Sequence, residues 1–400
     1  MISRALLVSL VLSACGAASA APVKITFWHS MDGVADLVEK FADDFNRSQD
    51  QYEVVPSVVG NYREAEPKLL AAVKAGKEPV MFQAELTFFP KLAADGLLAN
   101  LDRFEKSFGP DFARDFYPAL WAGGEVGGVR YGLPWNVSVP VMYYNAGALR
   151  RAGVGAPRTL ADLEAAARKL GGRGKKPLLT VADAWTFESL VAAQGGSVTR
   201  DGKPNFTSPE VVAALDLLAR MVQQGTAVGR TLDEAPRAAF DFARGQNSLV
   251  FASVANWPDF QKLALLFELG GAPMPCAQKC AVSVGGANVV VLKSASAQEQ
   301  AGAVAFWKYL MEPANLRTWV ERTFYVAPRR SVQGQLADFY AKNPYRAAAF
   351  AQLDSAVPRP KEPGYALWRL DLEEAISKAT RGGVPARQAL EEAQRKALAR

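Results

Sequence analysis

The chain of 400 residues contains a single histidine, His29. This scarcity excludes a histidine-rich metal site, and a Ser-His-Asp arrangement could be built only on that one residue. Pairs of Asp and Glu suffice for glycoside hydrolysis, so a hydrolase that works with carboxylates alone stays open at this stage. We expect neither a metal nor a cofactor.

Long runs of one charge sign are also missing. The sequence has 46 Lys and Arg against 40 Asp and Glu, a net charge of +6, which is compatible with an anionic ligand. Basic pieces such as Arg173 to Lys176 are short and no nucleic-acid module surrounds them, so we expect no nucleic-acid partner. Half of the residues are apolar and 22% are charged, as in a water-soluble globular protein. At about 100–200 residues per domain, this length predicts two domains or lobes.

The N-terminus carries a short apolar run. Arg4 provides a positive charge, residues 5–12 are apolar, and Ala18 to Ala20 form a small-residue cleavage site. This order predicts a signal peptide over residues 1–20, and the run is shorter than the roughly 20 residues that span a bilayer. The residues up to Cys15 also resemble a bacterial lipobox, which would make residues 1–14 a lipoprotein leader and Cys15 a lipid anchor. Either interpretation exports the protein to the periplasm or the cell-envelope surface.

Cysteine is scarce as well, with three residues in the chain. Once Cys15 is removed or lipidated, Cys276 and Cys280 remain as an even pair in an oxidising compartment. We expect them to close a small disulfide loop with a structural role. A two-cysteine metal site is the alternative, but beyond His29 and the removed or lipidated Cys15 the chain has no histidine or cysteine to complete it.

Strand and helix patterns alternate along the rest of the chain. Apolar alternation predicts a strand over 23–28, and Val34, Leu37, Val38, Phe41 and Phe45 recur at helical spacing. The same patterns predict strands over 52–59, 80–83, 139–144, 247–253 and 288–292, and helices over 64–75, 88–94, 301–311 and from 370 onward. Helix starts are indicated at Thr159 and at Ser208-Pro209, the latter helix ending before Gly225.

This alternation predicts an α/β fold with mostly parallel sheets. Because no Gly/Ser linker separates the two halves, strands should cross directly between lobes. Ligands of such folds sit in the crevice at the carboxyl ends of the strands, and the lobes close by hinge bending.

The segment from Phe27 to Gly33, FWHSMDG, resembles the opening of the extracytoplasmic solute-binding proteins that serve sugar-type ABC importers. More narrowly, it resembles their glycerol-3-phosphate-binding branch. Other pieces fall in the family's order: Gly60-Asn61-Tyr62, Pro134-Trp135-Asn136 through Tyr143-Tyr144-Asn145, Gly285-Gly286-Ala287 and Glu312-Pro313-Ala314-Asn315. The resemblance covers essentially the whole mature chain.

The resemblance implies a two-lobed periplasmic-binding-protein fold of the α/β class, with a hinge and a ligand cleft between the lobes. One lobe would contain residues 23–137 plus 285–330. The other would contain residues 138–284 plus 331–400.

The resemblance also implies eight ligand contacts. Tyr62 would hydrogen-bond the ligand through its hydroxyl, Glu85 would hold ligand hydroxyls, and Ser138 would donate to an oxygen. Trp185 would pack against a carbon face of the ligand. Ser253, the N–H of Gly286 and Arg369 resemble the family's phosphate contacts. Tyr325 falls in the stretch Phe-Tyr-Val-Ala-Pro, one residue longer than the Gly-Tyr-Leu-Pro turn of the family.

On this basis the chain is expected to be the binding component of an ABC importer and not an enzyme. It would act as a monomer, binding glycerol-3-phosphate or a glycerophosphodiester and delivering it to the permease's transmembrane subunits. A bidentate arginine with neutral donors around it suits a phosphate.

Two alternatives stay open. An oligosaccharide-binding protein of the same importer class could use the aromatic faces of Trp135, Trp185, Trp257 and Trp368. A carboxylate-pair hydrolase is less favoured, because no motif pairs two acids.

Overall fold

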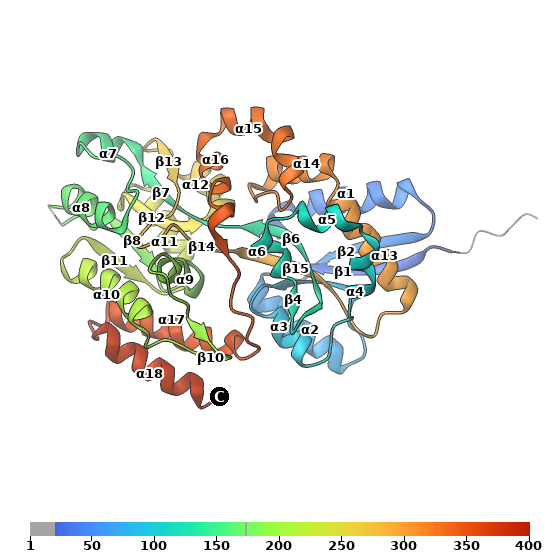
Figure 1. Ribbon diagram of the computed structural model, residues 1–400. Coiled ribbons are helices and arrows are strands. Elements are labelled where there is room, and N and C mark those ends of the chain that lie inside the picture. Colours follow the sequence, from blue (N-terminus) through green and yellow to red (C-terminus); the bar gives the residue numbers. More distant parts are fainter. Residues whose placement is uncertain (1–20, 173) are drawn as a thin grey trace, which may run out of the picture.

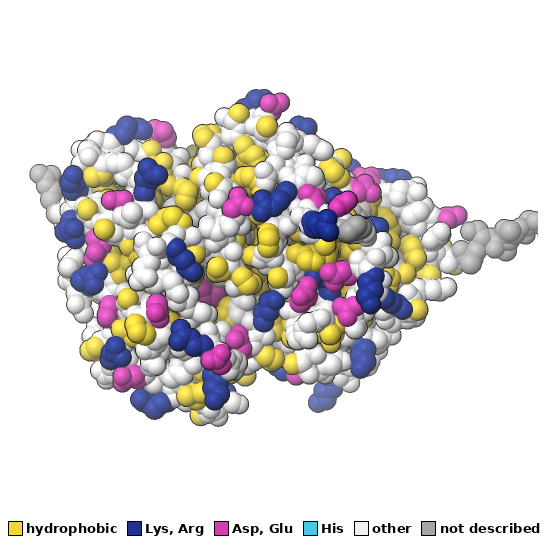
Figure 2. Space-filling model, in the orientation of Figure 1, with side chains coloured by type: hydrophobic (Ala, Val, Ile, Leu, Met, Phe, Trp, Pro, Cys, Tyr) yellow, Lys and Arg dark blue, Asp and Glu magenta, His cyan; other side chains and the backbone are white. Residues whose placement is uncertain are grey.

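A computed structural model of the chain describes residues 21–172 and 174–400. The predicted leader and Cys15 lie outside these residues. Two α/β lobes lie side by side, each built around a five-stranded sheet (Figure 1). Among the described residues, no helix is both long and apolar enough to cross a membrane. On the face shown in Figure 2, Lys and Arg are interspersed with Asp and Glu, as the small net charge suggests.

The sheet of lobe 1 has the order β2-β1-β3-β15-β6. Its strands are β1 (Val23–His29), β2 (Tyr52–Val58), β3 (Met81–Glu85), β6 (Gly132–Ser138) and β15 (Gly285–Val291). Strand β15 runs antiparallel to both of its neighbours, β3 and β6, whereas β2, β1 and β3 are parallel. The expected mostly parallel sheet is therefore present, and the reversed strand is the one that enters from the other lobe.

Helices cover both faces of this sheet. They are α1 (Ala35–Ser48), α2 (Tyr62–Lys74), α3 (Phe89–Ala94), α4 (Asp102–Ser107), α5 (Pro110–Arg114), α6 (Pro118–Ala122), α13 (Ala297–Leu310) and α14 (Pro313–Thr323). Short elements complete the lobe: η1 (Asp32–Val34), β4 (Glu125–Val126) and β5 (Val129–Arg130). In α1, the predicted stripe from Leu37 to Phe45 is buried against the sheet.

Lobe 2 repeats the plan with the order β11-β8-β12-β7-β13. Its strands are β7 (Pro140–Asn145), β8 (Leu178–Val181), β11 (Ala227–Arg230), β12 (Leu249–Ser253) and β13 (Leu269–Ala272). Here β7 is the reversed strand, antiparallel to β12 and β13. It follows directly from the crossing after β6.

The helices of lobe 2 include the C-terminal pair. They are α7 (Ala146–Arg151), α8 (Leu160–Leu170), α9 (Ala184–Ala193), α10 (Pro209–Gln223), α11 (Ala235–Ala243), α12 (Trp257–Leu263), α16 (Pro344–Phe350), α17 (Tyr365–Arg381) and α18 (Ala386–Leu398). Small elements are β9 (Thr199–Arg200), β10 (Lys203–Pro204) and η2 (Val254–Asn256). Helices α17 and α18 pack on α10 at the lower edge of the lobe (Figure 1).

The chain crosses between the lobes without a linker. The first crossing joins β6 to β7, and the second joins β14 (Val282–Ser283) to β15. The third runs through η3 (Arg330–Leu336) and α15 (Ala337–Lys342), and η4 (Leu353–Ser355) and β16 (Ala356–Val357) follow α16. Val332 and Leu336 of η3 are buried in the core of lobe 1, past residue 330, where the sequence predicts that lobe 1 ends.

The two helix starts that were predicted from capping residues are confirmed. Thr159 and Asp162 form a capping box at α8, and Ser208 caps α10, which Gly225 follows with φ +72. Two predicted starts were late. Helix α13 begins at Ala297, after a capping box of Ser296 and Glu299, and α17 begins at Tyr365.

Cys276 and Cys280 form a disulfide. The loop that it closes is held against two helices of lobe 2. The Leu160 N–H donates to the Cys276 carbonyl at 2.9 Å, and the Lys279 N–H donates to the Ala193 carbonyl at 3.1 Å. The loop therefore joins the start of α8 to the end of α9.

Candidate ligand-binding site between the lobes

A cavity of about 310 Å³ lies between the lobes, at the ends of β3, β6 and β12. All eight residues singled out from the sequence line it: Tyr62, Glu85, Ser138, Trp185, Ser253, Gly286, Tyr325 and Arg369. Sequence reasoning missed the other lining residues: Arg63, Asp183, Leu232, Ala255, Asn256, Gly285, Arg359 and Glu373. The cavity thus sits at the carboxyl ends of parallel strands, where such folds bind ligands.

Tyr62 presents a neutral hydroxyl whose position is set by a buried amide chain. The Asn136 side chain donates to the Tyr62 hydroxyl at 2.8 Å, and Gln83 donates to Asn136 Oδ1 at 2.9 Å. Burial raises the pKa of Tyr62 well above its usual value, so the hydroxyl keeps its proton. Because the oxygen already accepts from Asn136, its own proton is available to donate to a ligand.

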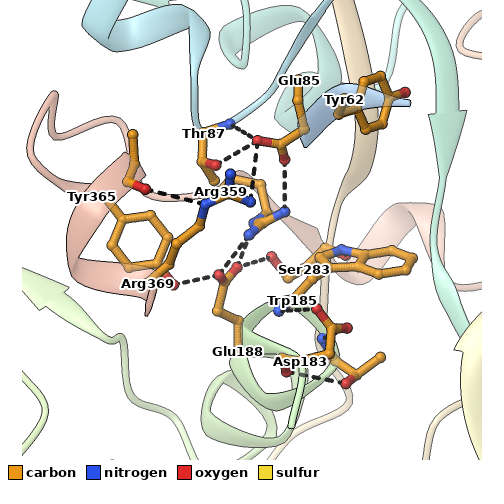
Figure 3. Close-up of polar contacts among 12 residues, drawn as sticks. Tyr62, Glu85, Thr87, Asp183, Trp185, Glu188, Ser283, Arg359, Tyr365 and Arg369 are labelled. Carbon is orange, nitrogen blue, oxygen red and sulfur yellow. Dashed lines mark hydrogen bonds and ion pairs between the residues drawn. The ribbon is translucent and has the colours of Figure 1, made fainter. Parts of the chain in front are cut away.

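A buried arginine joins the two lobes beneath the cavity. Arg359, from the segment between β16 and α17, lies between Glu85 of lobe 1 and Glu188 of α9 (Figure 3). Its Nη1 donates to Glu85 at 3.1 Å, and its Nη2 donates to Glu188 at 2.8 Å. Glu188 also accepts from the Tyr365 hydroxyl at 2.5 Å and from the Ser283 hydroxyl at 2.9 Å. A buried charge must be paired in this way to be tolerated.

Both carboxylate oxygens of Glu85, which the sequence predicts to hold ligand hydroxyls, already accept hydrogen bonds within the protein. One of its oxygens accepts from Arg359, and the other accepts from the backbone N–H and the hydroxyl of Thr87. Burial alone would raise the pKa of Glu85, but Arg359, Arg369 and the Thr87 hydrogen bonds outweigh burial and lower it. Glu85 is therefore an ionised carboxylate beside two arginines, and it lines the cavity.

Arg369, in the first turns of α17, has no comparably close partner. Its guanidinium lies 3.7 Å from Glu66 and 3.9 Å from Glu85, and its Nε donates to the Ala366 carbonyl at 3.3 Å. The side chain is only 15% exposed, so water is largely excluded around it. A largely buried guanidinium whose Nη groups stand 3.7 and 3.9 Å from carboxylates suits an oxyanion.

Two carboxyl groups near Arg369 are poised to titrate. Burial raises the pKa of Glu66 and of Glu373 to about 7, although Arg369 and Arg63 oppose the shift. Glu373 also pairs with Arg63 at 3.2 Å. Below neutral pH both acids become uncharged, and the cavity then presents a more positive field to an anion.

Trp185 forms one wall of the cavity. Its Nε1 donates to the Ser283 carbonyl at 3.0 Å, and Asp183 caps the helix on which it lies. A β-carbon on Gly285 would collide with the indole ring. Glycine at this position is therefore needed to let the indole lie against the strand, which fixes the ring beside the cavity.

A second hollow, of about 400 Å³, continues from the cavity into lobe 2. The two share Asp183, Trp185, Leu232, Ser253 and Asn256. The remaining walls come mainly from apolar residues of β8, β12, α11 and α12, and Asp183 and Asp259 are the charged residues in this lining. The arginines of the combined space therefore all lie in the first cavity, together with Glu85 and Glu373, and the second hollow adds Asp259 to the shared Asp183.

The single histidine is away from this site. His29 is buried at the end of β1, where its Nδ1 accepts from the Met31 N–H at 3.3 Å. Burial lowers its pKa to about 4, so the ring is neutral at physiological pH. It is a packed residue of lobe 1.

The family of bacterial extracellular solute-binding proteins matches residues 40–348 of the chain. The chain belongs to this family. Proteins of this family are the solute-binding components of ABC importers. The match therefore confirms the family resemblance seen in the sequence.

Relatives and solved structures agree with this assignment. The solute-binding protein is 27% identical to the sn-glycerol-3-phosphate-binding periplasmic protein UgpB of Yersinia pestis bv. Antiqua, over 87% of this chain and 84% of that protein. UgpB from Mycobacterium tuberculosis, solved in complex with glycerophosphocholine, superimposes with a TM-score of 0.83 at 22% identity, covering 95% and 98% of the two chains. A cyclic alpha-maltosyl-1,6-maltose binding protein from Arthrobacter globiformis gives 0.83 at 23% identity, covering 95% and 99%. The two-lobed α/β fold is thus confirmed.

Proposed function

We propose that this solute-binding protein binds a glycerol phosphate, either glycerol-3-phosphate or a glycerophosphodiester, in the interlobe cavity and passes it to the importer's permease. The observation that carries the proposal is Arg369, a largely buried guanidinium whose nearest carboxylates stand 3.7 and 3.9 Å away and which lines a cavity that also presents hydroxyl groups. A bidentate arginine–phosphate pair is one of the strongest polar contacts available to a protein.

The lining supports a consistent placement of such a ligand. The phosphate would lie on Arg369 with the Ser253 hydroxyl and the Gly286 N–H around it. The glycerol hydroxyls would meet the Tyr62 proton and the Ser138 hydroxyl, and the carbon chain would lie along the indole of Trp185. Each polar group of the ligand then finds a partner, which matters because an unpaired buried group costs about 1–3 kcal/mol.

The second hollow favours a diester over a monoester. It opens beside Ser253, where a substituent on the phosphate would point, and its volume is larger than that of the cavity itself. Both kinds of ligand occur among the similar proteins reported above. The Yersinia protein is named as glycerol-3-phosphate-binding, and the mycobacterial one was solved in complex with glycerophosphocholine.

A sugar ligand is less well supported by the lining. Sugars favour stacking on several aromatic faces, but of the four tryptophans considered only Trp185 lines the cavity. Trp135 stacks on Trp319, and Trp257 stacks on Tyr345 at 3.4 Å. Trp368 packs against the core of lobe 2.

Binding without catalysis is part of the proposal. The carboxylate pair of Glu85 and Glu188 is tied up by Arg359, so neither acid is placed to act as general acid or nucleophile on a bound ligand. Ligand instead shifts the population of the lobes toward closure, because it contacts residues of both. The permease would recognise the closed form.

A thermal-shift screen of the mature protein tests the proposal, with glycerol-3-phosphate, glycerophosphocholine, inorganic phosphate, maltose and trehalose as probes. At 100 times the dissociation constant a true ligand should stabilise the fold by about 2.7 kcal/mol. Stabilisation by the glycerol phosphates alone is the expected result. Stabilisation by a sugar alone would overturn the phosphate assignment, and turnover of glycerophosphocholine during the incubation would overturn the non-enzymatic one.

A further inference from the structure

Arg346 of α16 is a buried cation without a counter-ion among the described residues. Its side chain is 6% exposed, and neither its Nε nor its Nη1 has a hydrogen-bond partner. Its guanidinium carbon lies 2.9 Å from the ring centre of Phe324 and 4.3 Å from that of Phe339. Aromatic faces therefore replace the carboxylate that a buried arginine usually has.

Phe324 has an unusual backbone. It ends α14 with φ +66, in the left-handed region, and Asp201 is the one other non-glycine residue with positive φ in the described ranges. Helices commonly end in this conformation on a glycine, because a β-carbon is strained there. Such a residue persists only when its surroundings hold it. The guanidinium of Arg346 lies over the ring of this residue.

The turn at Phe324 determines where the next residue goes. Tyr325 lines the interlobe cavity, and its ring stacks on Trp319 at 5.7 Å. Directly after it, the Val326 N–H donates to the Val137 carbonyl of β6 at 2.9 Å. A change of φ at Phe324 would therefore move Tyr325 relative to the strand that carries Ser138.

We propose that Arg346 is a positioning residue of the ligand site: by covering Phe324, it holds the left-handed turn that places Tyr325 in the cavity. Arg346 itself is absent from the lining of the cavity. Its effect on the ligand is therefore indirect, through the backbone of two residues in lobe 1.

The neighbour of Arg346 extends this support to the other wall of the site. Tyr345 stacks on Trp257 of α12 at 3.4 Å, with the two rings nearly parallel at 9°. Trp257 follows Asn256, which lines the cavity from lobe 2. Two successive residues of α16 thus contact the segments that carry a cavity residue in each lobe.

The test uses Arg346→Met, which keeps the volume and removes the charge, together with Arg346→Lys, Phe324→Gly and the double variant Phe324→Gly/Arg346→Met. Two quantities are measured on the full mature protein. One is hydrogen exchange at the amides of residues 324–326 without ligand. The other is affinity by calorimetry for glycerophosphocholine, an arm that rests on the proposed function.

We expect Arg346→Met to speed exchange at these amides and to weaken binding about tenfold. Arg346→Lys should recover part of both, because it restores the charge but not the flat guanidinium. The double variant should return both to near the wild-type values, since glycine adopts positive φ without support. Arg103→Met controls for the removal of an arginine from a phenylalanine face on the surface, because Arg103 covers Phe104 at 4.6 Å outside the cavity lining, and it should change neither quantity.

Two results would overturn the inference. One is an Arg346→Met variant with a lower melting temperature but with the hydrogen exchange and ligand affinity of the wild type. That outcome would mean that Arg346 has a purely structural role. The other is a double variant as impaired as Arg346→Met, which would mean that the turn is not what Arg346 controls. If the wild type does not bind the probe, the proposed function fails, and the exchange experiment still decides this inference.

Discussion

Replacing Arg369 by alanine should separate ligand affinity from folding stability. Without ligand, the guanidinium stands 3.7 Å and 3.9 Å from its nearest carboxylates, so neither ion pair is within hydrogen-bond distance. Glu85 keeps Arg359 at 3.1 Å in the variant, and Glu66 can take up a proton. The variant loses one hydrogen bond, from the Arg369 Nε to the Ala366 carbonyl, so we expect the free energy of unfolding of the ligand-free protein to fall by about 1 kcal/mol.

The bound state should respond much more strongly. Truncating one partner of a buried, hydrogen-bonded charge pair costs about 2–5 kcal/mol, which corresponds to about 30- to 5,000-fold in the dissociation constant. The dissociation constant of Arg369→Lys should fall between those of the wild type and Arg369→Ala, because lysine keeps the charge but cannot form the bidentate contact. Arg63→Ala is a suitable comparison, since Arg63 also lines the cavity but is half exposed and already paired with Glu373.

The assay is isothermal titration with glycerol-3-phosphate and glycerophosphocholine, combined with urea unfolding of the ligand-free variants. The reasoning would be refuted if Arg369→Ala bound as tightly as the wild type. It would also be refuted if the ligand-free variant lost more than about 3 kcal/mol, which is the range expected for a broken buried pair. In that case Arg369 would be a structural residue that happens to face the cavity.

The buried acids and Arg359 lead to two further predictions. Because burial raises the pKa of Glu66 and Glu373 to about 7 from 4.5, the stability that they contribute is complete below pH 4.5 and is lost as the pH rises to 7. Urea unfolding should show this decline, and a Glu66→Gln/Glu373→Gln variant that declines equally would contradict it. Arg359→Met leaves Glu188 without a cation and Glu85 with only the more distant Arg369, and it should reduce the free energy of unfolding by about 3–5 kcal/mol. Adding Glu188→Gln to Arg359→Met should recover part of that loss. If Arg359→Met lowered the free energy of unfolding by less than about 1 kcal/mol, the ion pairs of Arg359 would not be the stabilising contacts that we infer.

Much of the local structure was predictable because its signals lie within a few residues. The alternation over 23–28, the stripe from Leu37 to Phe45 and the caps at Thr159 and Ser208 all depend on neighbours in sequence. The family motif then related eight distant positions to one ligand, and the structure brings all eight to one cavity. Their contacts with a ligand stay a prediction.

The sequence by itself thus determined the α/β class, most helix and strand positions and a set of candidate contacts. Only the tertiary structure decided what Arg359 does, because its partners Glu85 and Glu188 lie 274 and 171 residues away in the chain. It also decided which tryptophan lines the cavity and where the third crossing lies. The physical reason is that propensity and capping act between neighbours, whereas burial, charge pairing and pKa depend on groups that only packing brings together.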